Sequence, residues 1–163
     1  MNLIVNVSKN WAIGKENGLL FHISQDMKYF KEHTTGKTVV MGRKTLESLP
    51  KGNPLPNRKN IVLTRDESFT KDGVTVYHSI DELLKNIGIA ESFDTYIMGG
   101  ESIYRELLPY CSMAFVTKVD EDVADADAFM VNLDDEPGWE IQEESETFEE
   151  KGYKFRFVTY VQK

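Results

Sequence analysis

Asp26 is the residue whose setting first suggests chemistry. Ile23 precedes it, Met27 adjoins it and Phe30 follows at helical spacing, so the acid shares a helix face that is otherwise apolar. Such a face should hold no charge without a partner, because burying an unpaired carboxylate is costly. Asp26 is therefore a candidate functional acid. The alternative is a charge that only stabilises the N-terminal end of a helix, and the spacing alone favours this alternative.

Two glycine-bearing junctions could bind phosphate. Residues 42–45 (Gly-Arg-Lys-Thr) and the pair 99–100 (Gly-Gly) each follow an apolar strand pattern and precede a helical one. Backbone amides at such a turn can approach a diphosphate, with the positive end of the next helix behind them, and one dinucleotide carries enough phosphate for both. A plain tight turn is the alternative for the glycine pair. Neither junction matches GxGxxG or GxxxxGK[ST], so neither a Rossmann fingerprint nor a P-loop is present.

Charge is unevenly distributed along the chain, although the formal net charge is −8. Residues 37–65 hold seven basic side chains and one acid, whereas residues 120–150 hold fourteen acids and no Lys or Arg. The net charge argues against nucleic acid as a partner, because that binding depends on cations that neutralise phosphates. The basic zone instead suits small anions. Solvated surface faces are the alternative for both stretches, Arg58 included, and Trp11 and Phe21 could be core residues.

The elements that must position these residues alternate between strand and helix. Strands are expected at 3–7, 37–41, 60–64, 74–77, 95–98 and 113–119, and helices at 25–33, 43–49, 79–87 and from 101 or 102 to 108. Ser24 is expected to cap the first helix and Gly36 to stop it, and Ser79 with Glu82 forms a capping box. Residues 8–21 are expected to form a long loop, and 139–148 with 153–161 a hairpin around 149–152.

This alternation predicts an α/β fold, a single-domain sandwich over residues 1–163. Its central sheet would be mostly parallel, with an antiparallel C-terminal hairpin at the edge and helices on both faces. Both glycine junctions would then point helix N-termini at the carboxyl edge of the sheet, which is where ligands bind in such folds.

Composition predicts a soluble globular protein. Hydrophobic residues make up 40% of the 163 residues, without a tract of 18 that could span a membrane. The N-terminus lacks a basic region and a small-residue cleavage site, so we expect no signal peptide and a cytoplasmic location. Cys111 is the only cysteine and there are three histidines, so we expect neither an internal disulfide nor a metal site.

Several blocks, in this order and spacing, resemble the dihydrofolate reductase family across essentially the whole chain. The pair MGR-x-T-x-E-S and PLP-x-R-x-N is especially specific, and it favours functional roles for Asp26, Arg58 and the glycine pair. The blocks are Ile13-Gly14, Phe21 to Phe30, residues 40–48 (VMGRKTLES), 54–60 (PLPNRKN), 97–100 (IMGG) with Tyr104, and Thr117.

The resemblance implies hydride transfer from NADPH to 7,8-dihydrofolate, which gives 5,6,7,8-tetrahydrofolate. The Asp26 carboxylate would pair with the pterin, supported by the Thr117 hydroxyl and an ordered water, and Arg58 would bind the glutamate α-carboxylate through a bidentate fork. The resemblance makes Asp26, Thr117, Phe21 and Leu19 catalytic. It makes Ile4, Val5, Asp26, Met27, Phe30, Leu49, Leu55, Arg58, Met98, Tyr104 and Thr117 substrate-binding.

The family resemblance also implies an NADPH site and antifolate inhibitors as ligands, and a monomer is the default expectation. Residues 8–21 would form a lid that Asp127 holds closed by accepting from amides near Gly14, with Asp125 as the competing candidate. The implied cofactor-binding residues are Asn6, Ile13, Gly14, Gly42, Arg43, Lys44, Thr45, Leu63, Thr64, Arg65, Gly99, Gly100, Glu101, Ser102, Ile103 and Tyr104.

The chain departs from the family pattern at four positions. Phe21 stands where the family usually has tryptophan, Leu20 where it often has proline, Asn6 where it commonly has a small residue, and Leu46 where it commonly has an aromatic residue. Two alternatives remain. A related NADPH-dependent pyrimidine reductase of riboflavin synthesis would lack the helical Asp together with the PLP-x-R-x-N block. A catalytically silent nucleotide-binding module need not retain Asp26, Thr117 and Arg58 together.

Overall fold

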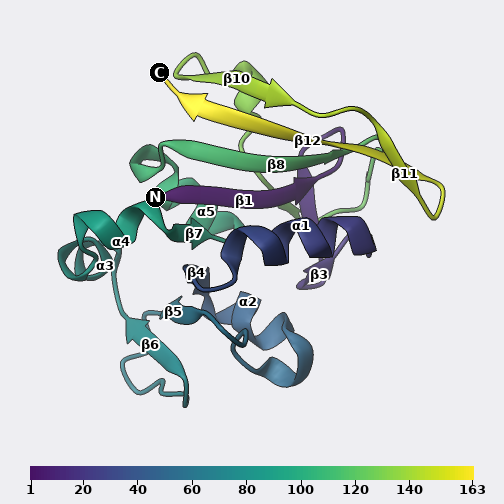
Figure 1. Cartoon of the computed structure of the whole chain (residues 1–163). Helices are drawn as coiled ribbons and strands as arrows, with labels where there is room; N and C mark the ends of the chain where they lie inside the picture. Colours follow the sequence, from purple (N-terminus) through teal and green to yellow (C-terminus); the bar gives the residue numbers. More distant parts are fainter.

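The computed structural model covers residues 1–163 and is built on one nine-stranded sheet (Figure 1). The strands run in the order β10-β12-β8-β1-β7-β4-β5-β6, and β11 pairs with β12. Every pairing from β8 through β6 is parallel, and the three pairings of β12 are antiparallel. The strands are β1 (Asn2–Val7), β4 (Thr38–Gly42), β5 (Lys59–Leu63), β6 (Val74–Tyr77), β7 (Thr95–Ile97), β8 (Met113–Val119), β10 (Trp139–Glu144), β11 (Phe148–Glu150) and β12 (Tyr153–Gln162).

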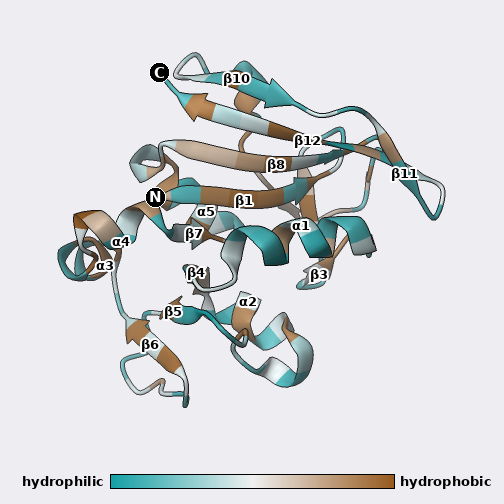
Figure 2. Ribbon diagram, viewed as in Figure 1, coloured by the Kyte–Doolittle hydropathy of each residue, from teal (hydrophilic) through white to brown (hydrophobic).

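Helices cover both faces of the sheet. Successive strand residues point to opposite sides, so each face carries apolar side chains against which helices pack. Leu3 and Ile97 belong to a cluster that includes residues of α3 and α5, whereas their neighbours Ile4 and Tyr96 pack with α1 and α2. In Figure 2 the hydrophobic colour lies along β1, and β10 at the sheet edge is mainly hydrophilic. The helices are α1 (Ser24–Thr34), α2 (Arg43–Ser48), α3 (Ile80–Asn86), α4 (Ile89–Phe93) and α5 (Glu101–Leu107), with 3-10 turns at Pro50–Gly52, Leu108–Tyr110 and Leu133–Asp135. The predicted fold class is thus confirmed.

Residues 8–21 are not the continuous loop that the sequence predicts. They contain β2 (Ala12–Lys15) and β3 (Gly18–Leu19), which pair antiparallel, and β2 also pairs with β9 (Ala128–Phe129). Glu16 and Asn17 turn the chain with φ of 50° and 58°. Two consecutive residues at positive φ before Gly18 fit a two-residue hairpin turn. The strands are short, and β9 lies more than a hundred residues away, so local alternation gave little signal.

The start of α1 also differs from expectation. Ser24 lies inside the helix, and the N-cap position is Ile23, which offers no capping side chain. Glu150 supplies the acceptors instead: its carboxylate accepts from the Ser24 amide at 2.6 Å, the Ser24 hydroxyl at 2.8 Å and the Gln25 amide at 3.1 Å. The cap therefore comes from β11, 126 residues along the chain, where no local pattern could indicate it.

The C-terminal antiparallel region is confirmed, with a break that was not expected. The segment 139–148 divides into β10, which ends at Glu144, and β11, which starts at Phe148. A register shift between Ile141 and Glu143 further interrupts the β10–β12 ladder. The hairpin turn at 151–152 uses Lys151 and Gly152 at φ of 53° and 82°. Helix α4 was not predicted either.

Candidate active site

The Asp26 carboxylate lies in the first turn of α1 against the middle of the sheet. The Thr117 hydroxyl donates to Oδ1 at 2.5 Å, and the Asn6 amide donates to Oδ2 at 2.8 Å. Asn6 and Thr117 are register partners on the parallel strands β1 and β8. The sheet thus presents one donor to each carboxylate oxygen.

Burial and hydrogen bonding act on Asp26 in opposite directions. Burial raises the pKa of the carboxyl above its usual value, and the bonds from Thr117 and Asn6 lower it only in part. No Lys or Arg forms an ion pair with it. Burial, with the charge of Asp26 added, also raises the pKa of Tyr29 to about 12 and that of Tyr104 in the same direction. A ligand that brings N–H donors would supply the partner that the protein lacks.

An apolar wall extends from Asp26 along the α1 and α2 side of the sheet. Phe30, Leu49, Leu55 and Met98, four of the predicted substrate-binding residues, pack partly buried against the cluster that contains Ile4. Met27 is 56% exposed on the same helix, so it is free to contact a ligand. These side chains come from α1, from the segment after α2 and from the residue that follows β7.

Arg58 is positioned by the C-terminal end of α1. Its Nε donates to the Thr34 hydroxyl at 2.9 Å and its Nη1 to the Pro56 carbonyl at 2.8 Å. The guanidinium lies 5.8 Å from the centre of the Phe30 ring and has no acidic partner. Partial burial lowers its pKa, yet Arg remains charged at any physiological pH. Its guanidinium is held in a fixed orientation, and some of its five N–H donors remain available to a ligand.

The two glycine junctions are in direct contact, at the sheet edge where the sequence predicts both. The Gly42 amide donates to the Gly99 carbonyl at 2.9 Å. A Cβ at Gly42 would lie 3.2 Å from Ile103, and one at Gly99 would lie 3.3 Å from the Tyr104 ring. Gly99 also has φ of +121°, which side chains rarely adopt. Backbone conformation and close packing thus favour glycine at position 99, and close packing favours it at position 42, where the N-termini of α2 and α5 approach one another.

Tyr104 connects the junctions with β1. Its buried hydroxyl donates to the Ile4 carbonyl at 2.7 Å, which uses one of the two acceptor directions of that carbonyl. Tyr104 belongs to the hydrophobic cluster that includes residues of α3 and α5, and not to the cluster that contains Ile4. The same cluster contains Val5, Leu63 and Ile103, and Ile13 packs partly buried against it.

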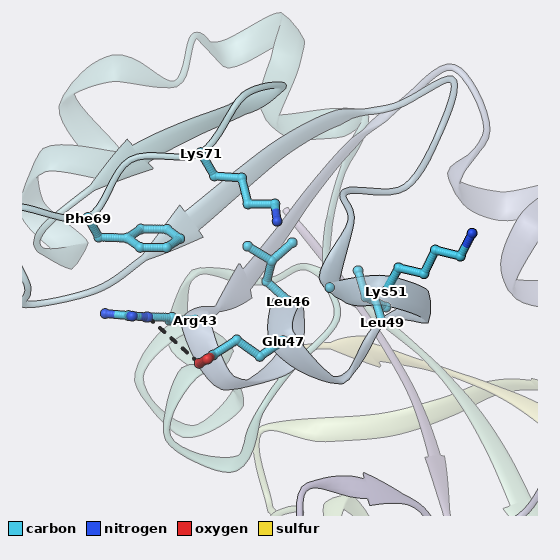
Figure 3. A pocket seen from close by; sticks show the side chains of 8 residues that line it. Arg43, Leu46, Glu47, Leu49, Lys51, Phe69 and Lys71 are labelled. Carbon is cyan, nitrogen blue, oxygen red and sulfur yellow. Dashed lines mark ion pairs between the residues drawn. The ribbon is translucent and has the colours of Figure 1, made fainter.

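Arg43 is engaged by protein groups. Its Nη1 lies 2.8 Å from Asp66, its Nε 3.7 Å from Glu47, and its guanidinium 4.6 Å from the Phe69 ring centre. These contacts border a cavity of about 530 Å³ between α2 and the 69–71 segment (Figure 3). Arg65 and Lys44 are exposed and form no ion pair, Thr45 and Thr64 are half-buried, and Ser102 is exposed.

Side-chain contacts tie the β2–β3 hairpin to both neighbouring regions. The Glu16 amide donates to Asp127 at 2.9 Å, and Lys15 forms an ion pair with Asp125. On the other side, the Asn17 amide group donates to the Lys44 carbonyl at 2.8 Å. Gly14 lies inside the hairpin, where a Cβ would meet the Gly18 carbonyl at 3.1 Å. The contact between Asp127 and an amide of this hairpin is the geometry that the lid hypothesis requires.

Leu19 and Phe21, both implied as catalytic, have contrasting environments. Leu19 is 57% exposed on β3. Phe21 is buried with Ile23, Val119 and Phe155, and its ring meets Tyr153 edge to face at 5.1 Å between centres. These surroundings are those of a packing residue that anchors the end of the hairpin.

Sequence reasoning missed two residues that support this site: Glu150 caps α1, and Asn17 bridges the hairpin to α2. Glu101, which is expected at the cofactor, also accepts from the Phe129 amide at 2.7 Å. The Asn6 contact with Asp26 was also not foreseen, although the alternation of β1 places Asn6 on the same face as Ile4. A polar residue on that face was the available signal.

Comparison with known proteins decides the family. The sequence profile of dihydrofolate reductase matches residues 1–162. The dihydrofolate reductase of Bacillus subtilis is 35% identical over 165 aligned positions, which cover 100% of this chain and 95% of the relative. The Staphylococcus haemolyticus enzyme is 38% identical, with 98% and 94% covered. The chain belongs to the dihydrofolate reductase family.

A solved member of the dihydrofolate reductase family has the same fold. Dihydrofolate reductase from Enterococcus faecalis, complexed with NADP(H) and RAB-propyl, superposes with a TM-score of 0.87 at 33% identity, covering 99% of this chain and 95% of that one. The present chain is accordingly an NADPH-dependent oxidoreductase. It has no helix long and apolar enough to cross a membrane, and no group of three or more His, Cys, Asp or Glu side chains that could hold a metal ion.

Proposed function

We propose that this protein reduces 7,8-dihydrofolate to 5,6,7,8-tetrahydrofolate with NADPH at the site around Asp26. The observation that carries the proposal is a carboxylate without a cationic partner, held by Thr117 and Asn6, beside an apolar wall that leads to the unpaired Arg58. A pterin offers N–H donors, a benzoyl group offers an apolar ring, and glutamate offers a carboxylate. The three parts of the substrate match the three parts of the site.

In this proposal Asp26 accepts from N3 and the 2-amino group of the pterin, with the Thr117 hydroxyl holding Oδ1. The backbone carbonyls of Ile4 and Met98 are further acceptors at the ring. Phe30, Leu49, Leu55 and Met27 enclose the benzoyl ring, and Arg58 binds the α-carboxylate with a bidentate fork, which is geometrically specific and strong.

The residues of the two junctions fit the diphosphate of NADPH. The support is the tight packing of Gly42 on Ile103 and of Gly99 on Tyr104, which brings the backbones at the α2 and α5 N-termini close together. Thr45 lies at the same place, since a Cβ at Gly100 would be 3.5 Å from its hydroxyl oxygen. Arg43, Thr64 and Arg65 would meet the 2′-phosphate.

When bound, NADPH supplies the hydride, which adds to C6 of the pterin. Asp26 orients the ring and favours arrival of a proton at N5. The hairpin of β2 and β3 excludes water while Asp127 holds it closed. Phe21 positions the base of that hairpin through its buried packing. A monomeric state and a cytoplasmic location remain predictions, as does inhibition by antifolates.

A single assay tests the proposal against its alternatives. Loss of NADPH absorbance is followed with dihydrofolate, with the pyrimidine substrate of riboflavin synthesis, and with neither. Oxidation that needs dihydrofolate supports the proposed function. Oxidation only with the pyrimidine would identify the pyrimidine reductase, and NADPH binding without oxidation in any mixture would identify a silent module.

A further inference from the structure

Asn6 is an unexpected neighbour for the Asp26 carboxylate. Its side-chain amide donates to Asp26 Oδ2 at 2.8 Å from the centre of β1, and Thr117 on β8 donates to Oδ1 at 2.5 Å. The two donors are register partners, so the sheet holds them side by side. Thr117 binds only one carboxylate oxygen of Asp26, and Asn6 binds the other.

Two donors restrict the carboxylate in a way that one cannot. The terminal torsion of Asp is broad, so a carboxylate held at one oxygen can still rotate about its last bond. A second bond to the other oxygen fixes the carboxylate plane. Each oxygen accepts in two directions, so one direction on each oxygen remains for a ligand. An amidine-like edge with two N–H groups matches that pair of free directions.

Nothing else on the elements around Asp26 takes this role. The charge of Asp26 raises the pKa of two tyrosines, Tyr29 on α1 and Tyr104 on α5. The Tyr104 hydroxyl donates to the Ile4 carbonyl, and neither tyrosine is among the groups bonded to Asp26. The bonds from Thr117 and Asn6 are also the only influences that lower the pKa of Asp26 against the effect of burial. Removing one of them should therefore be measurable in the titration of this group.

We propose that Asn6 is a positioning residue that fixes the plane of the Asp26 carboxylate and so sets how the pterin edge is held. The inference rests on the proposed function of Asp26. It adds a residue that acts through Asp26, at a position where the family commonly has a small side chain that could not make this bond.

The test compares Asn6→Ala, Asn6→Leu and Asn2→Ala in the full-length enzyme. Asn6→Leu keeps most of the side-chain volume and removes the amide group, so it guards against a packing loss in Asn6→Ala. Asn2→Ala is the matched control: it removes an amide from the same strand, where Asn2 donates to the Phe93 carbonyl at 2.9 Å. The readouts are the 13C NMR titration of the Asp26 carboxyl, assigned by its disappearance in Asp26→Asn, and kcat and KM for dihydrofolate against pH.

Both Asn6 variants should raise the titration midpoint of Asp26 by about one pH unit, because a lost hydrogen bond to the charged form disfavours that form. They should also raise KM for dihydrofolate about tenfold through the lost alignment. Asn2→Ala should change neither readout. The inference is overturned if both Asn6 variants titrate and turn over like wild type, or if Asn2→Ala shifts the midpoint equally. If Asp26→Asn itself keeps wild-type activity, the proposed role of Asp26 fails, while the titration still reports on the Asn6 contact.

Discussion

At the scale of single residues, the site is built by leaving certain charges without opposite charges. Arg58 is held by a hydroxyl and a carbonyl, and Asp26 by a hydroxyl and an amide, so neither charge is neutralised within the protein. Arg43 differs, because Asp66 and Glu47 already contact its guanidinium. Charges that are oriented but not paired are the ones that a charged substrate can use.

This difference bears on cofactor choice. Arg43→Ala combined with Arg65→Ala should lower the preference for NADPH over NADH, because charge-assisted bonds to the 2′-phosphate are lost; each contributes roughly 1.5–3 kcal/mol, about ten- to a hundredfold in affinity. The measurement is kcat/KM for both cofactors. Since Arg43 is shared with two acids, Arg65→Ala alone should account for much of the change. Lys85→Ala on α3 is a control for lost positive charge, and an unchanged ratio in the double variant would refute the assignment.

At the scale of elements, α1 depends on a distant acid to begin where it does. Bonds from the Ser24 backbone and hydroxyl, followed by those from Gln25, lower the pKa of Glu150. An acid with a lowered pKa in the folded state stabilises the protein above its unfolded value of 4.5, and that stability is lost as the pH falls through the folded pKa. Glu150 thus supports the helix that carries Asp26 at neutral pH.

Glu150→Gln should therefore lower the melting temperature at pH 7 by a few degrees, since a neutral amide is a weaker acceptor at a helix N-terminus. The difference from wild type should shrink as the pH is taken below 4.5. Thermal unfolding followed by circular dichroism over this range is the measurement. Glu149→Gln, whose side chain caps nothing, is the matched control, and a melting difference that does not depend on pH would contradict the capping role.

The two predicted helix caps, at Ser24 and at Ser79, show what local sequence can predict. The predicted cap at Ser79 is correct: the Ser79 hydroxyl accepts from the Glu82 amide at 3.0 Å, three residues away. The Glu82 side chain reaches one residue further back than a capping box requires and accepts from the His78 amide at 2.8 Å. The Ser24 cap is wrong although Ser24 has the same residue type, because Glu150 reaches the helix only after the sheet has formed. The β2–β3 hairpin was missed for the same reason, since β2 needs β9 as a partner. Caps and strands completed by distant segments leave little trace in nearby residues.

The proposed role of the β2–β3 hairpin as a lid gives a further prediction. Asp127→Ala removes the acceptor for the Glu16 amide, so it should slow hydride transfer and weaken NADPH binding while dihydrofolate binding changes little. Pre-steady-state NADPH oxidation and cofactor titrations measure both effects. Asp127→Asn keeps an acceptor oxygen and should lose less. Asp125→Ala removes only the exposed ion pair with Lys15; if it causes these losses and Asp127→Ala is silent, the latch is Asp125.

At the scale of the whole molecule, the sheet brings together residues that are far apart in sequence. The alternation of strand and helix predicted the fold and the placement of both glycine junctions at one sheet edge, because a parallel sheet gathers its carboxyl ends there. The pairing of Asn6 with Thr117 across β1 and β8 could not be predicted, since it depends on strand order and register. Functional roles for Asp26 and Arg58 came from family resemblance, because spacing alone favoured ordinary surface charge.

The fold also determines how ionised Asp26 affects the folding stability of the protein. Burial raises its pKa above 3.8, so the folded state binds that proton more tightly than the unfolded chain does. Above its unfolded pKa the ionised group therefore opposes folding. Asp26→Asn should accordingly be at least as stable as wild type at pH 7, so a loss of activity in this variant is not explained by unfolding.

The most direct test of the account is kcat/KM against pH for wild type and Asp26→Asn, with NADPH saturating and its acid decomposition subtracted. A positioned acid–base group contributes roughly 10²–10⁴-fold, so the variant should lose most of its activity at pH 7. Its residual rate should rise as the pH is lowered. The fraction of substrate already protonated at N5 increases about tenfold for each pH unit lowered, as long as the pH stays above the pterin pKa. Wild type should flatten over the same range. A variant that stays within about tenfold of wild type at pH 7, or that shares its pH profile, would mean that Asp26 is only a helix-end charge.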